Sequence, residues 1–265
     1  MNYLYHYTSL NGLLGILKKD GLHFHGTRYD CLNDPNEYIF PKNVVLPLLI
    51  KSLKGTEYDI SDYDEAYPYF VSFSKAKDCL DMWRLYGAEI ALVINPKFLK
   101  ELPMDNRPAI CREVVYVESE EEIHNAAVEL FNTAEVQDHN PINHFIDSVF
   151  PFIKHKNYET EQEVRLAWAD YKLGQFFSDT GDLVECEIPT NVHCDRSRNG
   201  LLQFYKNFKV KKAALVKIVV NASNPTQFER LEHQIGLLLR QRNYDEKRIQ
   251  ITKSKCASFT ETAGK

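Results

Sequence analysis

Short apolar segments with two different periodicities limit what this chain can fold into. The longest, such as Val44–Ile50 and Ile90–Ile94, are far too short to cross a bilayer. Some alternate as strands do and others repeat every three or four residues as helices do, in an order that is neither regular strand–helix alternation nor all strand. The sequence therefore predicts an α+β fold, and the absence of repeats and Gly/Ser-rich linkers favours a single domain over residues 1–265.

The predicted elements follow from these periods, from turn residues and from capping patterns. Helices are expected at Leu10–Lys19, at Asp78–Tyr86, after the capping-box pair Ser119 and Glu122, and from Asn224-Pro225 onward, with Phe228, Leu231, Ile235 and Leu238 facing inward. Strands are expected at Tyr3–Tyr7, Leu22–His25, Tyr69–Phe73, Glu89–Ile94, Arg112–Val117, Glu163–Ala169, Leu183–Ile188, Ala213–Val220 and Ile249–Thr252. Segments 29–37 and 55–66 are predicted as turn and loop.

Charge, cysteines and missing motifs exclude several classes of protein. The formal net charge of −5 is not that of a general nucleic-acid binder, although a local basic groove stays possible. Six scattered cysteines without a Cys-x-x-Cys pair, and a start without a basic and apolar leader, indicate reduced thiols in the cytoplasm. The chain contains no P-loop, G-x-G-x-x-G or G-x-S-x-G pattern, which argues against P-loop, typical Rossmann and typical α/β-hydrolase proteins.

The first candidate site lies near the N-terminus. If the first segment is a strand, His6 and Thr8 project to the same face. An imidazole beside a hydroxyl can donate and accept hydrogen bonds, which suits a ribose or an amide. The alternative is a core histidine followed by a helix that Thr8 or Ser9 caps. The spacing does not decide between these two interpretations.

The second candidate site is the Glu161-Gln162-Glu163-Val164-Arg165 segment. On a strand, the carboxylates of Glu161 and Glu163 point the same way, and double ionisation is then unfavourable. One carboxyl group with a raised pKa beside one that stays charged would stabilise a cationic transition state and activate a hydroxyl or amine. The alternative is a solvated strand edge on which Arg165 pairs with Glu163.

Three further patterns carry weaker signals. Trp83 and Tyr86 share a helix face, where they would wall a pocket for a flat heterocycle or pack as ordinary core. His23 and His25 lack a third ligand with recognisable spacing, so no metal site is predicted. The basic, aromatic stretch Arg196–Lys212 would contact RNA or phosphates, or form a solvated helix face over a buried aromatic stripe.

Taken together, the ordered motifs resemble the bacterial domain-of-unknown-function family 2971. They are L-Y-H-Y-T-S at Leu4–Ser9, L-N-D-P-N-E at Leu32–Glu37, F-V-S-F-S at Phe70–Ser74, M-W-R-L-Y-G at Met82–Gly87, E-Q-E-V-R at Glu161–Arg165 and S-K at Ser254-Lys255. That family is in turn similar to ADP-ribosyltransferases of the His-Tyr-Glu type. The resemblance implies an ADP-ribosyltransferase-like split antiparallel or mixed β-sheet core with flanking helices.

The resemblance also implies roles for particular residues, with NAD as the substrate. His6 would bond a ribose, with Tyr7, Thr8 and Asn11 beside it in the NAD pocket. An aromatic side chain would stack on nicotinamide, and the counterparts are Tyr69, Phe73, Trp83 and Tyr86, with Ser74 nearby. Glu163 would stabilise the oxocarbenium ion, and Glu161 would prepare the acceptor, although the two roles could be exchanged.

The expected function is therefore an NAD-consuming ADP-ribosyltransferase or NAD glycohydrolase. It would transfer ADP-ribose to an unidentified protein or nucleic acid in a bacterial toxin or phage-defence setting, with a regulatory partner protein as a further expectation. One alternative is a catalytically inactive sensor that binds NAD or ADP-ribose. The other is an RNA-phosphate-modifying enzyme on the same scaffold that uses the Arg196–Lys212 stretch.

Overall fold

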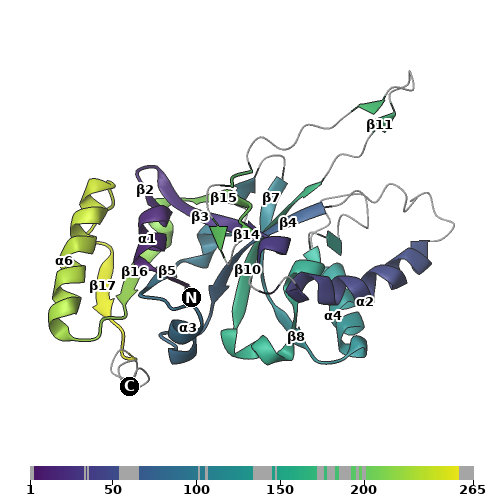
Figure 1. The fold of residues 1–265 in the computed structure, drawn as a ribbon, viewed down its shortest axis with the longest axis horizontal. Coiled ribbons are helices and arrows are strands. Elements are labelled where there is room, and N and C mark those ends of the chain that lie inside the picture. The colour runs from purple at the N-terminus through teal and green to yellow at the C-terminus, as the bar shows by residue number, and fades with distance from the viewer. Residues whose placement is uncertain are drawn as a thin grey trace.

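A computed structural model gives the fold of the chain. It describes residues 3–32, 34, 36–53, 66–100, 102–104, 107–133, 145–146, 148–171, 176–177, 183–184, 192–194, 197–198 and 201–256. Within these ranges the protein is mixed α/β, with one large mixed sheet and several helices (Figure 1).

Eleven strands of the described residues form the large sheet. Its main path runs β17-β16-β5-β1-β4-β10-β7-β6, and β2, β3 and β15 join it through β4. The strands in chain order are β1 (Leu4–Thr8), β2 (Leu17–Lys18), β3 (Gly21–Arg28), β4 (Ala66–Ser74), β5 (Ile90–Ile94), β6 (Leu102–Met104), β7 (Arg107–Glu113), β10 (Glu163–Tyr171), β15 (Tyr205–Val210), β16 (Leu215–Val220) and β17 (Gln250–Lys253). Among the described pairs of this sheet, β16 and β17 are parallel and the others are antiparallel.

The remaining elements flank the large sheet. The helices are α1 (Leu10–Ile16), α2 (Asn36–Leu53), α3 (Leu80–Leu85), α4 (Glu120–Thr133) and α6 (Pro225–Gln241), and the 3-10 helices include η1 (Tyr29–Cys31), η4 (Phe150–Phe152) and η5 (Lys156–Glu161). Short strand pairs are β8 (Val115–Val117) with β9 (Ile153–His155), β11 (Phe176–Phe177) with β12 (Leu183–Val184), and β13 (Ser197–Arg198) with β14 (Leu201–Leu202).

One edge of the central strand β4 is shared by two different strands. Near its C-terminal end β4 pairs with β1, through Tyr5 and Ser74. Further towards its N-terminus β4 pairs with β3, through Thr27 opposite Phe70 and Arg28 opposite Tyr69. The opposite edge of β4 pairs with β10 along its whole length. The sheet is therefore split along one side of β4, between β1 and β3.

Separate clusters of apolar side chains cover the two faces of the sheet. Side chains alternate along each strand, so Val164 and Leu166 of β10 face the cluster that α1 and α6 cover, whereas Ala167 faces the cluster beside α2 and α4. A smaller cluster packs α3 against β1 and β5. Figure 1 shows α6 outside β16 and β17 at one end of the sheet and α2 and α4 together at the other.

Several predicted elements are confirmed with small shifts of their ends. The side chain of Asn224 caps α6 by accepting a hydrogen bond from the Gln227 N–H, and the four predicted inward residues pack on the core. Ser119 accepts a hydrogen bond from the Glu122 N–H, as expected at the start of α4. Most predicted strands of the large sheet begin within two residues of their predicted starts, namely β1, β3, β5, β10, β16 and β17. Strand β4 begins earlier than predicted, at Ala66.

Three predicted boundaries are wrong. The first helix ends at Ile16 because Leu17 and Lys18 turn away to pair with β3. The predicted strand Arg112–Val117 is broken at Val114, since β7 pairs with β10 while β8 pairs with β9. Residues 212–214 form a 3-10 turn rather than the start of β16. Most of segments 55–66 and 183–188 lies outside the described residues.

Helix α2 was missed because two prolines, Pro41 and Pro47, lie inside it. Proline removes a helical hydrogen bond and normally ends a helix. Tertiary packing overrides this preference here, since Tyr38, Val45 and Leu49 are buried against α4 and the η4 turn.

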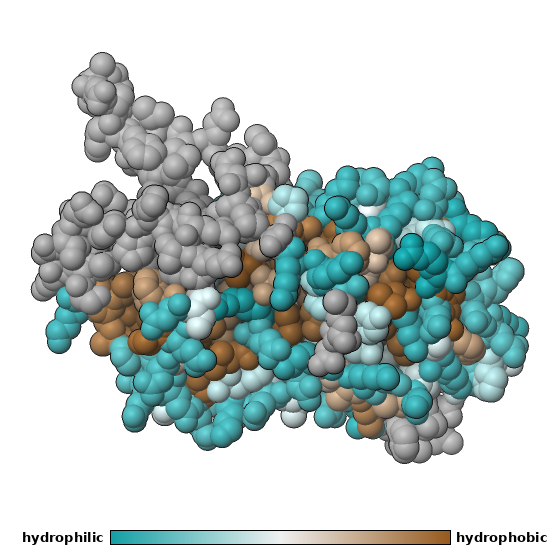
Figure 2. Space-filling model, turned by 180° about the vertical axis from the view of Figure 1, so that it is seen from behind, coloured by the Kyte–Doolittle hydropathy of each residue, from teal (hydrophilic) through white to brown (hydrophobic). Residues whose placement is uncertain are grey.

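On the side opposite to that of Figure 1, apolar residues show in the middle of the coloured part of the face, and hydrophilic residues follow its lower-left and right-hand rim (Figure 2). None of the described helices combines the length and apolar character that crossing a membrane requires. Cys31, Cys79, Cys111, Cys194 and Cys256 are free thiols.

Candidate functional site

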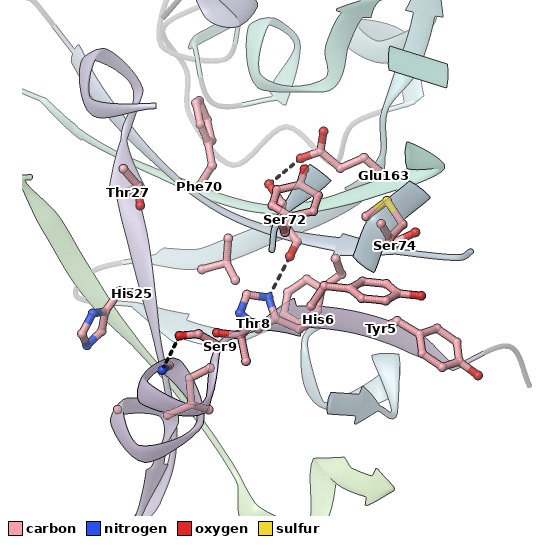
Figure 3. A pocket seen from close by; sticks show the side chains of 18 of the residues that line it. Tyr5, His6, Thr8, Ser9, His25, Thr27, Phe70, Ser72, Ser74 and Glu163 are labelled. Atoms are coloured by element: carbon pink, nitrogen blue, oxygen red, sulfur yellow. Dashed lines mark hydrogen bonds between the residues drawn. The ribbon is translucent and has the colours of Figure 1, made fainter. Parts of the chain in front are cut away.

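A cavity of about 620 Å³ lies at the split in the sheet. Its walls come from β1, the start of α1, β3, β4, the end of α3, and the η5–β10 segment (Figure 3). This volume is within the usual range of small-molecule sites, which combine apolar walls with a few polar groups. The cavity therefore joins segments that are far apart in the sequence.

His6 occupies the place where the ladder between β1 and β4 is interrupted. Its Nδ1 donates to the main-chain oxygen of Ser72 over 2.9 Å, and its ring packs against the rings of Phe24 and Phe73 at 5.0 and 5.6 Å. Burial lowers the pKa of His6, and the Ser72 carbonyl only partly opposes this effect. The imidazole is therefore neutral at pH 7, with Nε2 left as the hydrogen-bond acceptor.

Ser72 connects the histidine to the acidic side of the cavity. Although it lies in the middle of a central strand, its side chain is exposed, because the split leaves this part of β4 uncovered. Its hydroxyl donates to Oε1 of Glu163 over 2.5 Å. Figure 3 shows Ser72 between His6 and Glu163, so one residue contacts both groups.

His6 and Glu163 project from opposite faces of the sheet. His6 alternates with Tyr5 and Tyr7 and packs on the face that α1 covers, whereas Glu163 shares the other face with Ala167. In a continuous sheet the two side chains would be separated by the backbone. The split allows both of them to border one cavity.

Glu163 is almost fully buried, at 3% exposure, and is held by two cations. Arg165 donates to both of its carboxylate oxygens, over 2.6 and 3.1 Å, and Lys154 donates to Oε2 over 3.2 Å. Burial acts to raise the pKa of Glu163, but the charges of Arg165 and Lys154 outweigh it and lower the pKa to about 2. Glu163 is therefore ionised at neutral pH.

Glu161 and Glu37 complete this buried network. Lys154 bonds Glu161 over 2.7 Å and Glu37 over 3.1 Å, and Arg165 also pairs with Glu37. Burial raises the pKa of Glu161, and the nearby charge of Lys154 only partly offsets this. Three carboxylates thus share two cations in the described network, and the pKa values of Glu161 and Glu163 are displaced in opposite directions.

A solvated strand edge at this segment is ruled out. β10 is an interior strand, paired with β4 on one side and β7 on the other. Arg165 is 1% exposed and Lys154 is 2% exposed. The two glutamates do not converge by strand alternation as expected, because Glu161 ends the η5 turn and Gln162 is left-handed, with φ of 45°. Lys154 brings their carboxylates together instead.

The predicted site residues divide into those that line the cavity and those that do not. The lining residues are His6, Tyr7, Thr8, Asn11, Phe73, Ser74, Tyr86, Glu161 and Glu163. Tyr69 and Trp83, two of the candidates for the stacking ring, are not among them. Tyr69 packs in the core, and Trp83 stands edge-on against Tyr7. Of the aromatic candidates, Tyr86 is 39% exposed, whereas Phe73 is 2% exposed and packed on Phe24.

Three local details refine these assignments. Ser9 caps α1 by accepting the Gly12 N–H over 3.1 Å, so the expected cap is Ser9, while Thr8 lines the cavity. Ser74 donates to the main-chain oxygen of Glu161 over 2.6 Å and so ties β4 to the acidic segment. Burial, with smaller effects of the nearby carboxylates, raises the pKa of the Tyr86 hydroxyl, although the side chain as a whole is 39% exposed.

Four residues of the network and its contacts were missed as site residues, Ser72 among them. Glu37 lies in one of the motifs that carry the family resemblance, so the motif was a usable signal. Tyr116, whose hydroxyl accepts the Glu163 N–H over 2.7 Å, lies in a segment predicted only as strand. Lys154 follows an apolar stretch and carries no pattern that marks it as buried.

The basic stretch after Arg196 is not a helix face. Its described part contains β15, in which Lys206 is buried and paired with Asp170 over 2.8 Å. Lys209 pairs with Asp20, and Phe204 stacks under Arg28. Of the two histidines considered as metal ligands, His25 stacks on Tyr205 beside the cavity and His23 contacts Asp20.

The fold and site therefore define a mixed α/β protein whose split sheet holds a cavity with apolar walls and several polar groups. Residues 82–166 match the family model described as "Protein of unknown function (DUF2971)" and support the relationship to that family. The matched segment includes Tyr86, Lys154, Glu161, Glu163 and Arg165, but not β1 or β4. No curated protein and no solved structure matched the chain.

Proposed function

We propose that the cavity binds NAD and that the protein cleaves the bond between nicotinamide and ribose, as an ADP-ribosyltransferase or NAD glycohydrolase. One observation carries this proposal: His6 and Glu163 border the same cavity and both contact Ser72. A neutral imidazole acceptor suits a ribose hydroxyl. A fixed, ionised carboxylate suits the positive charge that develops when nicotinamide leaves.

The proposed reaction uses the two glutamates differently. The bond between the ribose anomeric carbon and the nicotinamide nitrogen breaks, and its electron pair leaves with nicotinamide. Glu163 stabilises the resulting oxocarbenium ion, and a nucleophilic oxygen or nitrogen of the acceptor, or water, then bonds to the anomeric carbon. Glu161, whose pKa burial raises, takes the proton that the acceptor releases.

A second candidate function is an NAD- or ADP-ribose-binding sensor without catalysis. It is favoured by the pairing of Glu163, because Arg165, Lys154 and Ser72 already occupy both of its carboxylate oxygens. A carboxylate that is fully paired stabilises a new positive charge less than a free one. Binding and cleavage must therefore be measured separately.

The direct test is to incubate the protein with NAD labelled in the nicotinamide ring and to measure both binding and release. We expect saturable binding and a release rate above that of NAD alone, with release measured by chromatography and binding by calorimetry. Binding of NAD without release of nicotinamide would exclude the enzyme and support the sensor function. Failure to bind NAD would contradict both functions.

A further inference from the structure

The cavity has a second polar end, away from the glutamates, which the proposed reaction does not use. It is formed by β3 and by the residues that precede β15. The Arg28 N–H donates to the Phe204 oxygen over 2.9 Å, and the Phe204 N–H donates to the Cys31 sulfur over 3.4 Å. Residues 202–205 therefore lie along residues 27–31, with Gln203 and Thr27 both on the cavity wall.

Gln203 is an almost fully buried residue on the cavity wall. Its side chain is 6% exposed, and it forms no hydrogen bond with any residue that the structure describes. The amide atoms of Gln203 are not among the buried polar atoms that lack a partner, so they are open to the cavity rather than enclosed in the core. Because Gln203 lines the cavity, a ligand in the cavity can supply the missing partner.

The surroundings of Gln203 indicate a flat ligand group. Ile16, Leu32 and Phe70 line the same cavity and provide apolar surface. The Thr27 hydroxyl, which forms no hydrogen bond with the described residues, adds a second polar group. A carboxamide offers one acceptor and two donor hydrogens, which match a planar edge with an N–H donor beside an acceptor. Gln pairs in this way with the amino edge of adenine.

The position of this end relative to Glu163 follows from the strand register. Thr27 lies opposite Phe70 of β4, and Ser72, which bonds Glu163, is two residues further along the strand. That offset is roughly 7 Å. One ligand can therefore contact Gln203 and the Ser72–Glu163 side of the cavity together.

We infer that Gln203 and Thr27 form a subsite for a planar ligand group that presents an amino or amide N–H beside an acceptor. This inference rests on the proposed function for its choice of ligand. An NAD molecule has two such groups, the amino edge of adenine and the carboxamide of nicotinamide. The N–H donor is lost when adenine lacks its amino group or when the amide nitrogen of nicotinamide is replaced by oxygen, and this loss defines the test.

The experiment measures binding by calorimetry for two pairs of probes, AMP against purine riboside monophosphate, which lacks the amino group, and nicotinamide against nicotinate. The unmodified protein should prefer the amino or amide member of one pair by roughly ten- to a hundredfold. The pair that shows the preference identifies which group of the ligand occupies the subsite. Gln203→Leu should bring the ratio of the two affinities in that pair close to one.

Controls separate the subsite from the fold and from catalysis. Gln234→Leu, on the exposed side of α6, should leave the preference unchanged. If Gln203→Leu lowers the thermal midpoint too far for binding to be measured, Thr27→Val provides a second variant and should reduce the preference severalfold. Glu163→Gln should keep the preference, so that loss of nicotinamide release and loss of the subsite are distinguishable. Equal binding within both pairs, no binding of any probe, or a preference that survives Gln203→Leu would overturn the inference.

Discussion

Replacing Glu163 by Gln should reduce nicotinamide release from NAD by at least roughly a hundredfold, the usual loss when a group that stabilises transition-state charge is removed. The substitution keeps the shape of the side chain and its place between Ser72 and Arg165, but it removes the negative charge. Because the carboxylate is ionised at neutral pH, that charge is present during the reaction. Release rates with saturating labelled NAD measure the effect.

Glu113→Gln is the matched control for this prediction. Glu113 lies opposite Val164 on the neighbouring strand β7, and its carboxylate is exposed and paired with Lys75 over 2.7 Å. The same chemical change there should leave release within twofold of the unmodified protein. Equal rates for Glu163→Gln and Glu113→Gln would exclude Glu163 from the chemistry, even if NAD binds in the cavity.

Replacing Lys154 by Met should lower the free energy of unfolding by about 3–5 kcal/mol. The ammonium group is buried and is the shared partner of Glu37, Glu161 and Glu163. Its removal leaves three largely buried carboxylates with one guanidinium. Urea unfolding followed by circular dichroism measures the change.

Lys156→Met provides the comparison for Lys154→Met. Lys156 is two residues further along the chain, its side chain is 54% exposed, and it pairs with Glu118 at the surface. Solvated pairs of this kind contribute little to stability. We therefore expect an unfolding midpoint close to that of the unmodified protein. A similar, small effect of both substitutions would mean that the buried network is not a main source of stability.

The site residues that can be predicted from the sequence are those marked by local spacing. His6, Thr8 and Glu163 lie on strands whose alternation is visible in the sequence, and the motifs around them carry the family resemblance. One carboxyl group with a raised pKa beside one that stays charged was expected from the proximity of the two glutamates, but burial raises the pKa of Glu161, and Arg165 and Lys154 lower that of Glu163. Local patterns thus identified the chemical groups of the cavity.

The remaining part depends on contacts between distant segments. The split beside β4 arises because β1 and β3 share one strand edge, and no single segment encodes that arrangement. Lys154 becomes a site residue only because η5 folds back over β9. Trp83 has the spacing of a pocket residue, but its indole N–H bonds Asp78 and its ring packs on Tyr7.

The central claim is that NAD binds in the cavity beside β1, and a pair of glycines tests it most directly. Gly15 in α1 lines the cavity, Gly236 lies in α6, and a Cβ at either position would meet no atom within 4 Å. Phenylalanine can therefore be placed at each position without a clash at its Cβ. Calorimetry should show that Gly15→Phe abolishes NAD binding while Gly236→Phe binds NAD like the unmodified protein. Undiminished NAD binding by Gly15→Phe would contradict the account.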